Sequence, residues 1–216
     1  TSNTYIICLP CTVDGIFSMR GIGFFAMLTA CVLSQSEDPF SEGNLEEFFL
    51  LFQVWLPDAC VFESSASEAC LQPDSDWVRS LILRSVRLHG PGSYVRESCG
   101  GPHLDVKSLP METQRGLSKF WPEMADGRSW RGEWHKYGTC TGLSADEYFD
   151  LALHLHQRSP KPSLLGDHLN AKVNASDLID VYGGTEFVVL MCHGESVFTG
   201  ARTCWEKKSD GTAGQQ

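Results

Sequence analysis

The sequence predicts a single α+β domain, and three observations support that class. Short apolar runs typical of buried strands lie among amphipathic helical patterns, without the regular alternation of βαβ units. The 216 residues are enough for one domain with a hydrophobic core, so a second domain is not required. Six of the nine cysteines lie downstream of residue 37, and this even number suits a framework of three disulfides.

Four apolar runs predict the strands. The second strand delivers His89 at its end, and the last is a turn with a return strand that Cys192 and Cys204 could staple. In chain order the predicted strands cover 46–57, 80–90, 185–192 and 193–204.

Helical patterns with clear start and stop signals predict four helices. Pro122 ends the first and Gly138 the second, while Ser144 and Glu147 form a capping box at the start of the third, which Pro160 prevents from continuing. The predicted helices cover 111–124, 129–138, 144–159 and 176–184.

The N-terminal segment has the pattern of a targeting signal. The stretch "MRGIGFFAMLTACVLSQS" (19–36) has one arginine, an apolar run and then small polar residues, which is typical of a secretory signal peptide. The apolar run is too short for a membrane span, which needs ~20 residues. The alternative is a buried helix inside the domain. Residues 1–36 are therefore interpreted as an extension plus signal peptide, and we expect a secreted or lysosomal protein with possible glycosylation at Asn174.

The net charge of the chain bears on whether it could bind a nucleic acid. The formal net charge is -10, and the field of an acidic chain repels phosphates, so the protein is not an obvious polyanion binder. A nucleic-acid function would need a local basic pocket or an acidic compartment. Four arginines supply positive charge around His89, unless they are simply scattered on the surface: Arg79, Arg84, Arg87 and Arg96.

The segment "RGEWHKYGTC" (131–140) concentrates chemistry-bearing side chains. On a helix, Glu133, Lys136 and Tyr137 share one face, whereas His135 points the other way. This face offers an acid, a cation and a hydroxyl, but no group that titrates near neutrality.

His89 is the candidate for the missing group. A disulfide between Cys99 and Cys140 would bring the chain after His89 to the 133–137 segment. The alternative is that His89 is an ordinary core or surface histidine and that the charges of 133–137 are solvated.

Four segments together resemble the ribonuclease T2 family. "EWHKYGTC" (133–140) resembles its second active-site segment, E-W-x-K-H-G-T-C, and "VRLHG" followed by "PGSYVRESC" (86–99) resembles the first, F-T-I-H-G-L-W-P…G-S-Y-P-x-x-C. "FFLLFQVWLPDAC" (48–60) and "VVLMCHGESVFTGARTC" (188–204) are similar to its first strand and its ending.

The resemblance covers about residues 46–206 and implies the architecture. We assign 37–206 to a domain like that of the family, followed by a polar tail at 207–216. The implied fold is a central antiparallel β-sheet flanked by helices and stapled by three disulfides. The implied pairs are Cys60–Cys70, Cys99–Cys140 and Cys192–Cys204.

The resemblance also implies the chemistry. The family cleaves single-stranded RNA by transphosphorylation, in which the ribose 2′-hydroxyl attacks the adjacent phosphorus and leaves a 2′,3′-cyclic phosphate. No metal or cofactor is needed because the nucleophile belongs to the substrate, and we expect a monomer that is not membrane-bound once the signal is removed. His89 matches the general acid, Glu133 and Lys136 match the pair that stabilises the phosphorane, and Tyr137 stands where the family has its second histidine, the general base.

Two departures from the family bear on function. Loss of an acid–base partner at Tyr137 typically costs ~10²–10⁴-fold in rate. The L-W-P after the first histidine is missing behind Gly90, and with it a base-stacking tryptophan. Tyr94 and Trp134 remain as candidate substrate-binding residues, although loop packing is an equal alternative for Tyr94. The implied function is an endoribonuclease with impaired catalysis; the alternative is a catalytically inactive, secreted RNA-binding or interaction protein.

Overall fold

The structure is a computed structural model. It describes residues 7–9, 47–62, 68–90, 94–123, 130–163, 165, 172–185, 187–193, 197–208, 211 and 213–214. The predicted signal peptide lies outside these residues.

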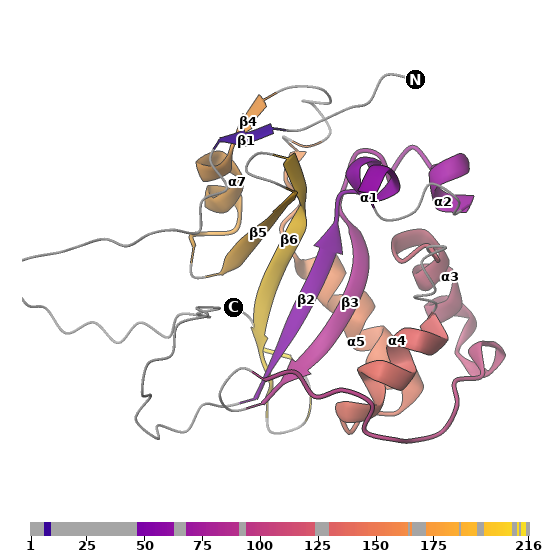
Figure 1. Ribbon diagram of the computed structural model, residues 1–216. Helices are drawn as coiled ribbons and strands as arrows, with labels where there is room; N and C mark the ends of the chain where they lie inside the picture. The colour runs from indigo at the N-terminus through magenta and orange to yellow at the C-terminus, as the bar shows by residue number, and fades with distance from the viewer. Residues whose placement is uncertain are drawn as a thin grey trace, which may run out of the picture.

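A six-stranded sheet forms the centre of the molecule (Figure 1). Its order is β3-β2-β6-β1-β4, and β5 pairs with β6. The pairs β2–β3, β2–β6 and β5–β6 are antiparallel, which confirms the predicted antiparallel sheet, while β1 and β4 form a parallel pair at its end. The strands are β1 (Ile7–Leu9), β2 (Phe48–Val54), β3 (Ile82–His89), β4 (Lys172–Asn174), β5 (Val188–His193) and β6 (Val197–Glu206).

The helices gather mainly on one side of this sheet. Helix α5 packs against β2 and β3, and α3 packs on α5 (Figure 1). The capping box predicted for α5 is present, with the Ser144 amide and hydroxyl donating to Glu147 Oε2 over 2.8 and 2.6 Å. The helices are α1 (Leu56–Phe62), α2 (Glu68–Leu71), η2 (Val106–Ser108), α3 (Met111–Phe120), α4 (Trp130–Lys136), η3 (Gly138–Cys140), α5 (Ala145–Arg158) and α7 (Ala175–Val181).

The two faces of the sheet differ in chemistry. Successive side chains of a strand point to opposite faces. On β3, Val86 and Leu88 join the core beneath the helices, together with Phe49 of β2 and Trp205 of β6. We call this side the helix face.

The opposite side of β3 carries Ser85, Arg87 and His89. The strand register places Phe52 beside Ser85 and Phe48 beside His89. We call this side the polar face, and it is the side on which the candidate site lies.

Two of the disulfides implied by the family resemblance are present. Cys60 and Cys70 are bonded with a Cα–Cα distance of 5.4 Å, and Cys99 and Cys140 with 5.0 Å. The first joins α1 to α2. The second ties the chain that follows β3 to the chain that follows α4.

The third implied pair is wrong. Cys192 and Cys204 are both disulfide-bonded, but the strand register keeps them too far apart to be bonded to each other. The register pairs Cys192 with Phe198, whereas Cys204 lies six residues further along β6, beside Leu50. At ~3.3 Å per residue this separates the two cysteines by ~20 Å, and a disulfide needs Cα atoms within ~7 Å.

Candidate active site

His89 is the last residue of β3, and its position is fixed by its neighbours in the fold. It is buried, with 3 % of its surface exposed. Its ring stacks on Phe48 at a centroid distance of 5.0 Å. His89 also forms a β-bridge with Val95, and the Gly90 amide donates to the Tyr94 carbonyl over 3.0 Å. Residues 94 and 95 therefore lie beside the end of β3.

Tyr94 packs over Gly90 and remains open to solvent. A Cβ atom on Gly90 would lie 2.8 Å from Tyr94 Cζ, so only glycine admits the ring at this distance. The Tyr94 side chain is 54 % exposed. An exposed aromatic ring therefore stands next to His89, where a nucleobase could stack on it.

Trp134, the other candidate for substrate binding, lies in the core. It is 3 % exposed, its indole donates to the Pro102 carbonyl over 2.8 Å, and its ring packs on Tyr148. Burial leaves no ring face for a base, so the expected substrate contact is wrong for Trp134. The residue instead anchors α4 to the helix face.

Glu133 reaches β3 through a serine. Its carboxylate is buried and accepts a hydrogen bond of 2.7 Å from the Ser85 hydroxyl. The same hydroxyl oxygen accepts a hydrogen bond of 3.2 Å from Arg87 Nε. Ser85 therefore bridges the carboxylate and the guanidinium.

Tyr137 is buried against Arg87. It follows the last residue of α4, is 4 % exposed, and its amide donates to the Glu133 carbonyl. The Arg87 guanidinium lies 4.4 Å from the centroid of the Tyr137 ring and 4.1 Å from that of Phe52. The phenol is thus fixed by a cation and by its own helix end.

Lys136 stands at the solvent edge of the same group. Its Nζ lies 5.0 Å from the Tyr137 ring centroid and 3.4 Å from Glu97 Oε1. A hydrogen bond with the Tyr137 side chain and the nearby Glu97 carboxylate raise the pKa of Lys136 above its usual value. The amine is therefore a permanent cation. His135, the preceding residue of the helix, is exposed as well.

The two predicted halves of the site are tied together. The Ser98 amide donates to the Lys136 carbonyl over 2.7 Å, next to the Cys99–Cys140 disulfide. On β3 itself, Ser85 contacts Glu133, Arg87 contacts Tyr137, and His89 follows two residues later on the same face. The residues form a continuous line along one strand and one helix end.

The sequence did not reveal Ser85 and Phe52 as site residues. It indicated Arg87 only as one of four arginines that supply positive charge around His89. One signal was available: the polar residues at 85, 87 and 89 alternate with the apolar residues at 86 and 88. The other predicted arginines have different surroundings. Arg79 is exposed in a turn, Arg84 is buried, and Arg96 pairs with Glu47 at 2.6 Å.

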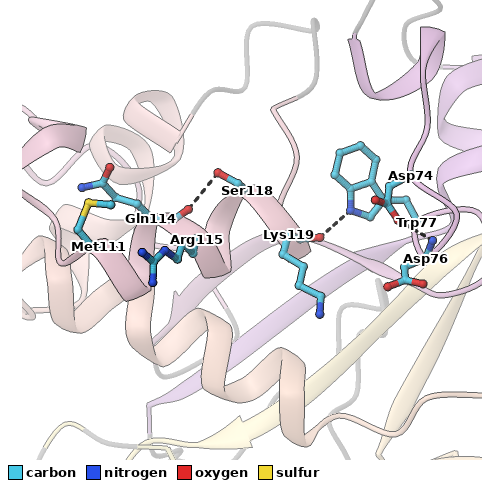
Figure 2. Close-up of a pocket in the computed structure, with 8 residues that line it drawn as sticks. All are labelled: Asp74, Asp76, Trp77, Met111, Gln114, Arg115, Ser118 and Lys119. Atoms are coloured by element: carbon cyan, nitrogen blue, oxygen red, sulfur yellow. Dashed lines mark hydrogen bonds between the residues drawn. The ribbon is translucent and has the colours of Figure 1, made fainter.

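A separate hollow lies away from these residues, between the 74–77 turn and α3 (Figure 2). Asp74, Asp76 and Trp77 line one side, and the Trp77 indole donates to the Lys119 carbonyl over 2.6 Å. Acidic and basic side chains both line it, and none of the predicted site residues does.

Asn174 is exposed where β4 meets α7, so its side chain is accessible. Within the described ranges, no His, Cys, Asp or Glu cluster is grouped so as to hold a metal ion. In the same part of the chain, none of the helices has the length and apolar character of a membrane span.

Known proteins match both the sequence and the fold. A ribonuclease MC of Momordica charantia is 28 % identical over 110 residues, which are 49 % of this chain and 54 % of the relative. The chain thus aligns with about half the length of that relative. RNase NT, solved in complex with 5′-AMP, has a TM-score of 0.61 at 21 % identity over 78 % of this chain and 88 % of that one.

An RNase-related protein from Calystegia sepium is similar in fold, with a TM-score of 0.58 at 19 % identity over 74 % and 86 % of the two chains. These structural likenesses establish the fold. The sequence model of the ribonuclease T2 family matches residues 46–179, which are more than half of the chain. Together with the order of the site segments along β3 and α4, this match shows that the chain belongs to the ribonuclease T2 family.

Proposed function

We propose that this protein binds single-stranded RNA on the polar face and cleaves it slowly by transphosphorylation. The observation that carries the proposal is the line formed by His89, Arg87 and Ser85 on β3, against which α4 sets Glu133 and Tyr137. The RNase NT complex with 5′-AMP supports a nucleotide as ligand of this fold. The expected setting is a secreted or lysosomal space.

The proposed reaction needs one proton removed and one supplied. The 2′-oxygen loses its proton and forms a bond to phosphorus, while the bond from phosphorus to the 5′-oxygen breaks and that oxygen takes up a proton. His89, as imidazolium, supplies the second proton. Lys136 and Glu133 border the phosphorus, where the amine offsets the negative charge of the phosphorane.

Tyr137 accounts for the expected slowness. A phenol hydroxyl is a much weaker proton acceptor than the imidazole that the family has at this place. Its ring is also held between Arg87 and the end of α4. The first proton must therefore leave to water, and the missing general base is worth ~10²–10⁴-fold in rate.

Digestion of single-stranded RNA between pH 4 and 7 in EDTA tests this mechanism. We compare the wild type with Tyr137→His, Tyr137→Phe and His89→Ala, and detect the 2′,3′-cyclic phosphate end. We expect feeble wild-type cleavage, a gain of at least ~10-fold for Tyr137→His, and further loss for His89→Ala. Tyr137→Phe should resemble the wild type, so a Phe variant that loses all activity would show that the phenol takes part in the reaction.

The Arg87–Tyr137 contact favours a second candidate, an RNA-binding protein without turnover. The Arg87 guanidinium stacks on Tyr137, the residue that stands where the family has its general base. Under this alternative, the wild type and every variant bind RNA and none produces the cyclic end. Cleavage that His89→Ala abolishes would eliminate it.

A further inference from the structure

Arg202 on β6 extends the polar face beyond the residues discussed so far. Its guanidinium Cζ lies 4.8 Å from the centroid of the Phe52 ring, and Arg87 lies 4.1 Å from the same centroid. The register places Phe52 between Arg202 and Ser85, on adjacent strands. Two cations from β3 and β6 therefore share one aromatic ring on β2.

Neither guanidinium has a counter-ion in the part of the chain that the structure describes. The ion pairs among these residues involve Arg96, Lys136 and Lys207 with Glu47 and Glu97. Arg87 uses Nε for the Ser85 hydroxyl, and Arg202 uses Nε for Met191 Sδ at 3.1 Å. Among the described residues, their terminal nitrogens have no hydrogen-bond acceptor and are therefore free to bind a ligand.

The two guanidinium groups around the Phe52 ring repel each other. Both side chains are half-buried, which reduces the screening of their mutual repulsion by water. Burial, and then the charge of Arg87, lower the pKa of Arg202. Of the carboxylates on the polar face, Glu133 reaches Arg87 only through the Ser85 hydroxyl, and Glu206 is four residues beyond Arg202 along β6. A bound anion would relieve the repulsion that this packing creates.

We propose that Arg87, Phe52 and Arg202 form a second phosphate subsite, which binds an RNA phosphate neighbouring the one at His89 and so directs the strand across the sheet from β3 to β6. This proposal rests on the proposed function. Planar guanidinium groups suit the paired oxygens of a phosphodiester, and two of them clamp it without reading the base. The strand then passes over a cationic path in a protein whose net charge is -10.

The test uses 2′-O-methyl RNA, which lacks the nucleophilic hydroxyl and therefore measures binding apart from cleavage. Oligonucleotides with one phosphate and with seven phosphates are titrated by fluorescence anisotropy at several salt concentrations. The variants are Arg202→Gln, Arg202→Lys and Arg158→Gln, the last being an exposed arginine at the end of α5. Circular dichroism and thermal melts verify that each variant folds.

For Arg202→Gln we expect about tenfold weaker binding of the long oligonucleotide, and a slope of log Kd against log salt smaller by ~0.7, the value for one phosphate contact on a single strand. Arg202→Lys should keep the slope, and Arg158→Gln should resemble the wild type. The one-phosphate ligand should bind Arg202→Gln and the wild type equally.

An Arg202→Gln variant with wild-type affinity and slope would overturn the subsite, as would an equal loss for the one-phosphate ligand. Neither result touches the proposed cleavage, which is scored on unmodified RNA. Conversely, a wild type that binds but never cleaves leaves the subsite intact and removes the nuclease proposal. A wild type that binds no RNA overturns both.

Discussion

The two faces of β3 differ sharply although they belong to the same eight residues. On the helix face, Val86 and Leu88 are 0 and 1 % exposed and pack among aromatic side chains. On the polar face, Ser85, Arg87 and His89 make hydrogen bonds, a cation–π contact and a ring stack. The comparison shows that residues 85–89 of this strand support the fold with positions 86 and 88 and carry the polar contacts with positions 85, 87 and 89.

The largest effect should come from breaking the helix face. Leu88→Ala removes an apolar side chain from the core and should lower the free energy of unfolding by ~2–5 kcal/mol in urea denaturation. Arg87→Met, one residue away on the polar face, keeps an unbranched side chain and should cost less than ~1 kcal/mol while weakening RNA binding. If Leu88→Ala and Arg87→Met lowered the free energy of unfolding equally, both faces of β3 would contribute to the core. The proposed difference between the two faces would then be wrong.

A buried, titratable polar group lies on the helix side of the sheet, and its effect on stability should depend on pH. His156 is buried on α5, where Gln53 Nε2 donates to its Nδ1 over 2.8 Å and the Ser159 hydroxyl donates to Gln53 Oε1. Burial, and to a lesser extent the charge of Lys161, lower the pKa of His156 from 6.5 to about 4.

The folded state therefore binds this proton more weakly than the unfolded state does. The stabilisation is complete above pH 6.5 and is lost as the pH falls towards 4, by ~3 kcal/mol for this group. His156→Asn keeps an acceptor for Gln53 and should flatten the dependence of unfolding free energy on pH. A variant as acid-sensitive as the wild type would assign the loss to other groups.

The smallest effect concerns the pair Arg87 and Tyr137. In a Tyr137→His protein the Arg87 cation should lower the pKa of the new imidazole. Adding Arg87→Thr should then move the acidic limb of the kcat/KM profile up by ~1 pH unit. An unmoved limb would mean that the imidazole does not face Arg87, and Arg158→Gln in the same background serves as the charge control.

The sequence allowed much of the site to be predicted, because its signals are local. The apolar run before His89 predicted the strand that delivers it, and Gly138 predicted where α4 ends. The placement of Trp134 could not be read in this way. Its motif position suggested a substrate contact, whereas its burial depends on Pro102 and Tyr148, which lie outside its helix.

The prediction of the third disulfide was wrong for a related reason. Order along the chain and similarity to the family suggested a bond between Cys192 and Cys204, but the β5–β6 register decides which residues stand opposite one another. Register is set by how strands align, and a slip of a few residues changes every cross-strand neighbour.

The sequence by itself determined the class of fold, the family, the strand and helix that carry the site, and the substitution of Tyr137 for a histidine. Each of these depends on residue identity or on periodicity within one element. Only the tertiary structure decided that Arg87 lies between Tyr137 and Phe52, and that Arg202 shares the Phe52 ring. These contacts join one helix end and three strands, and the energy of bringing two cations together depends on distance and burial that no single element contains.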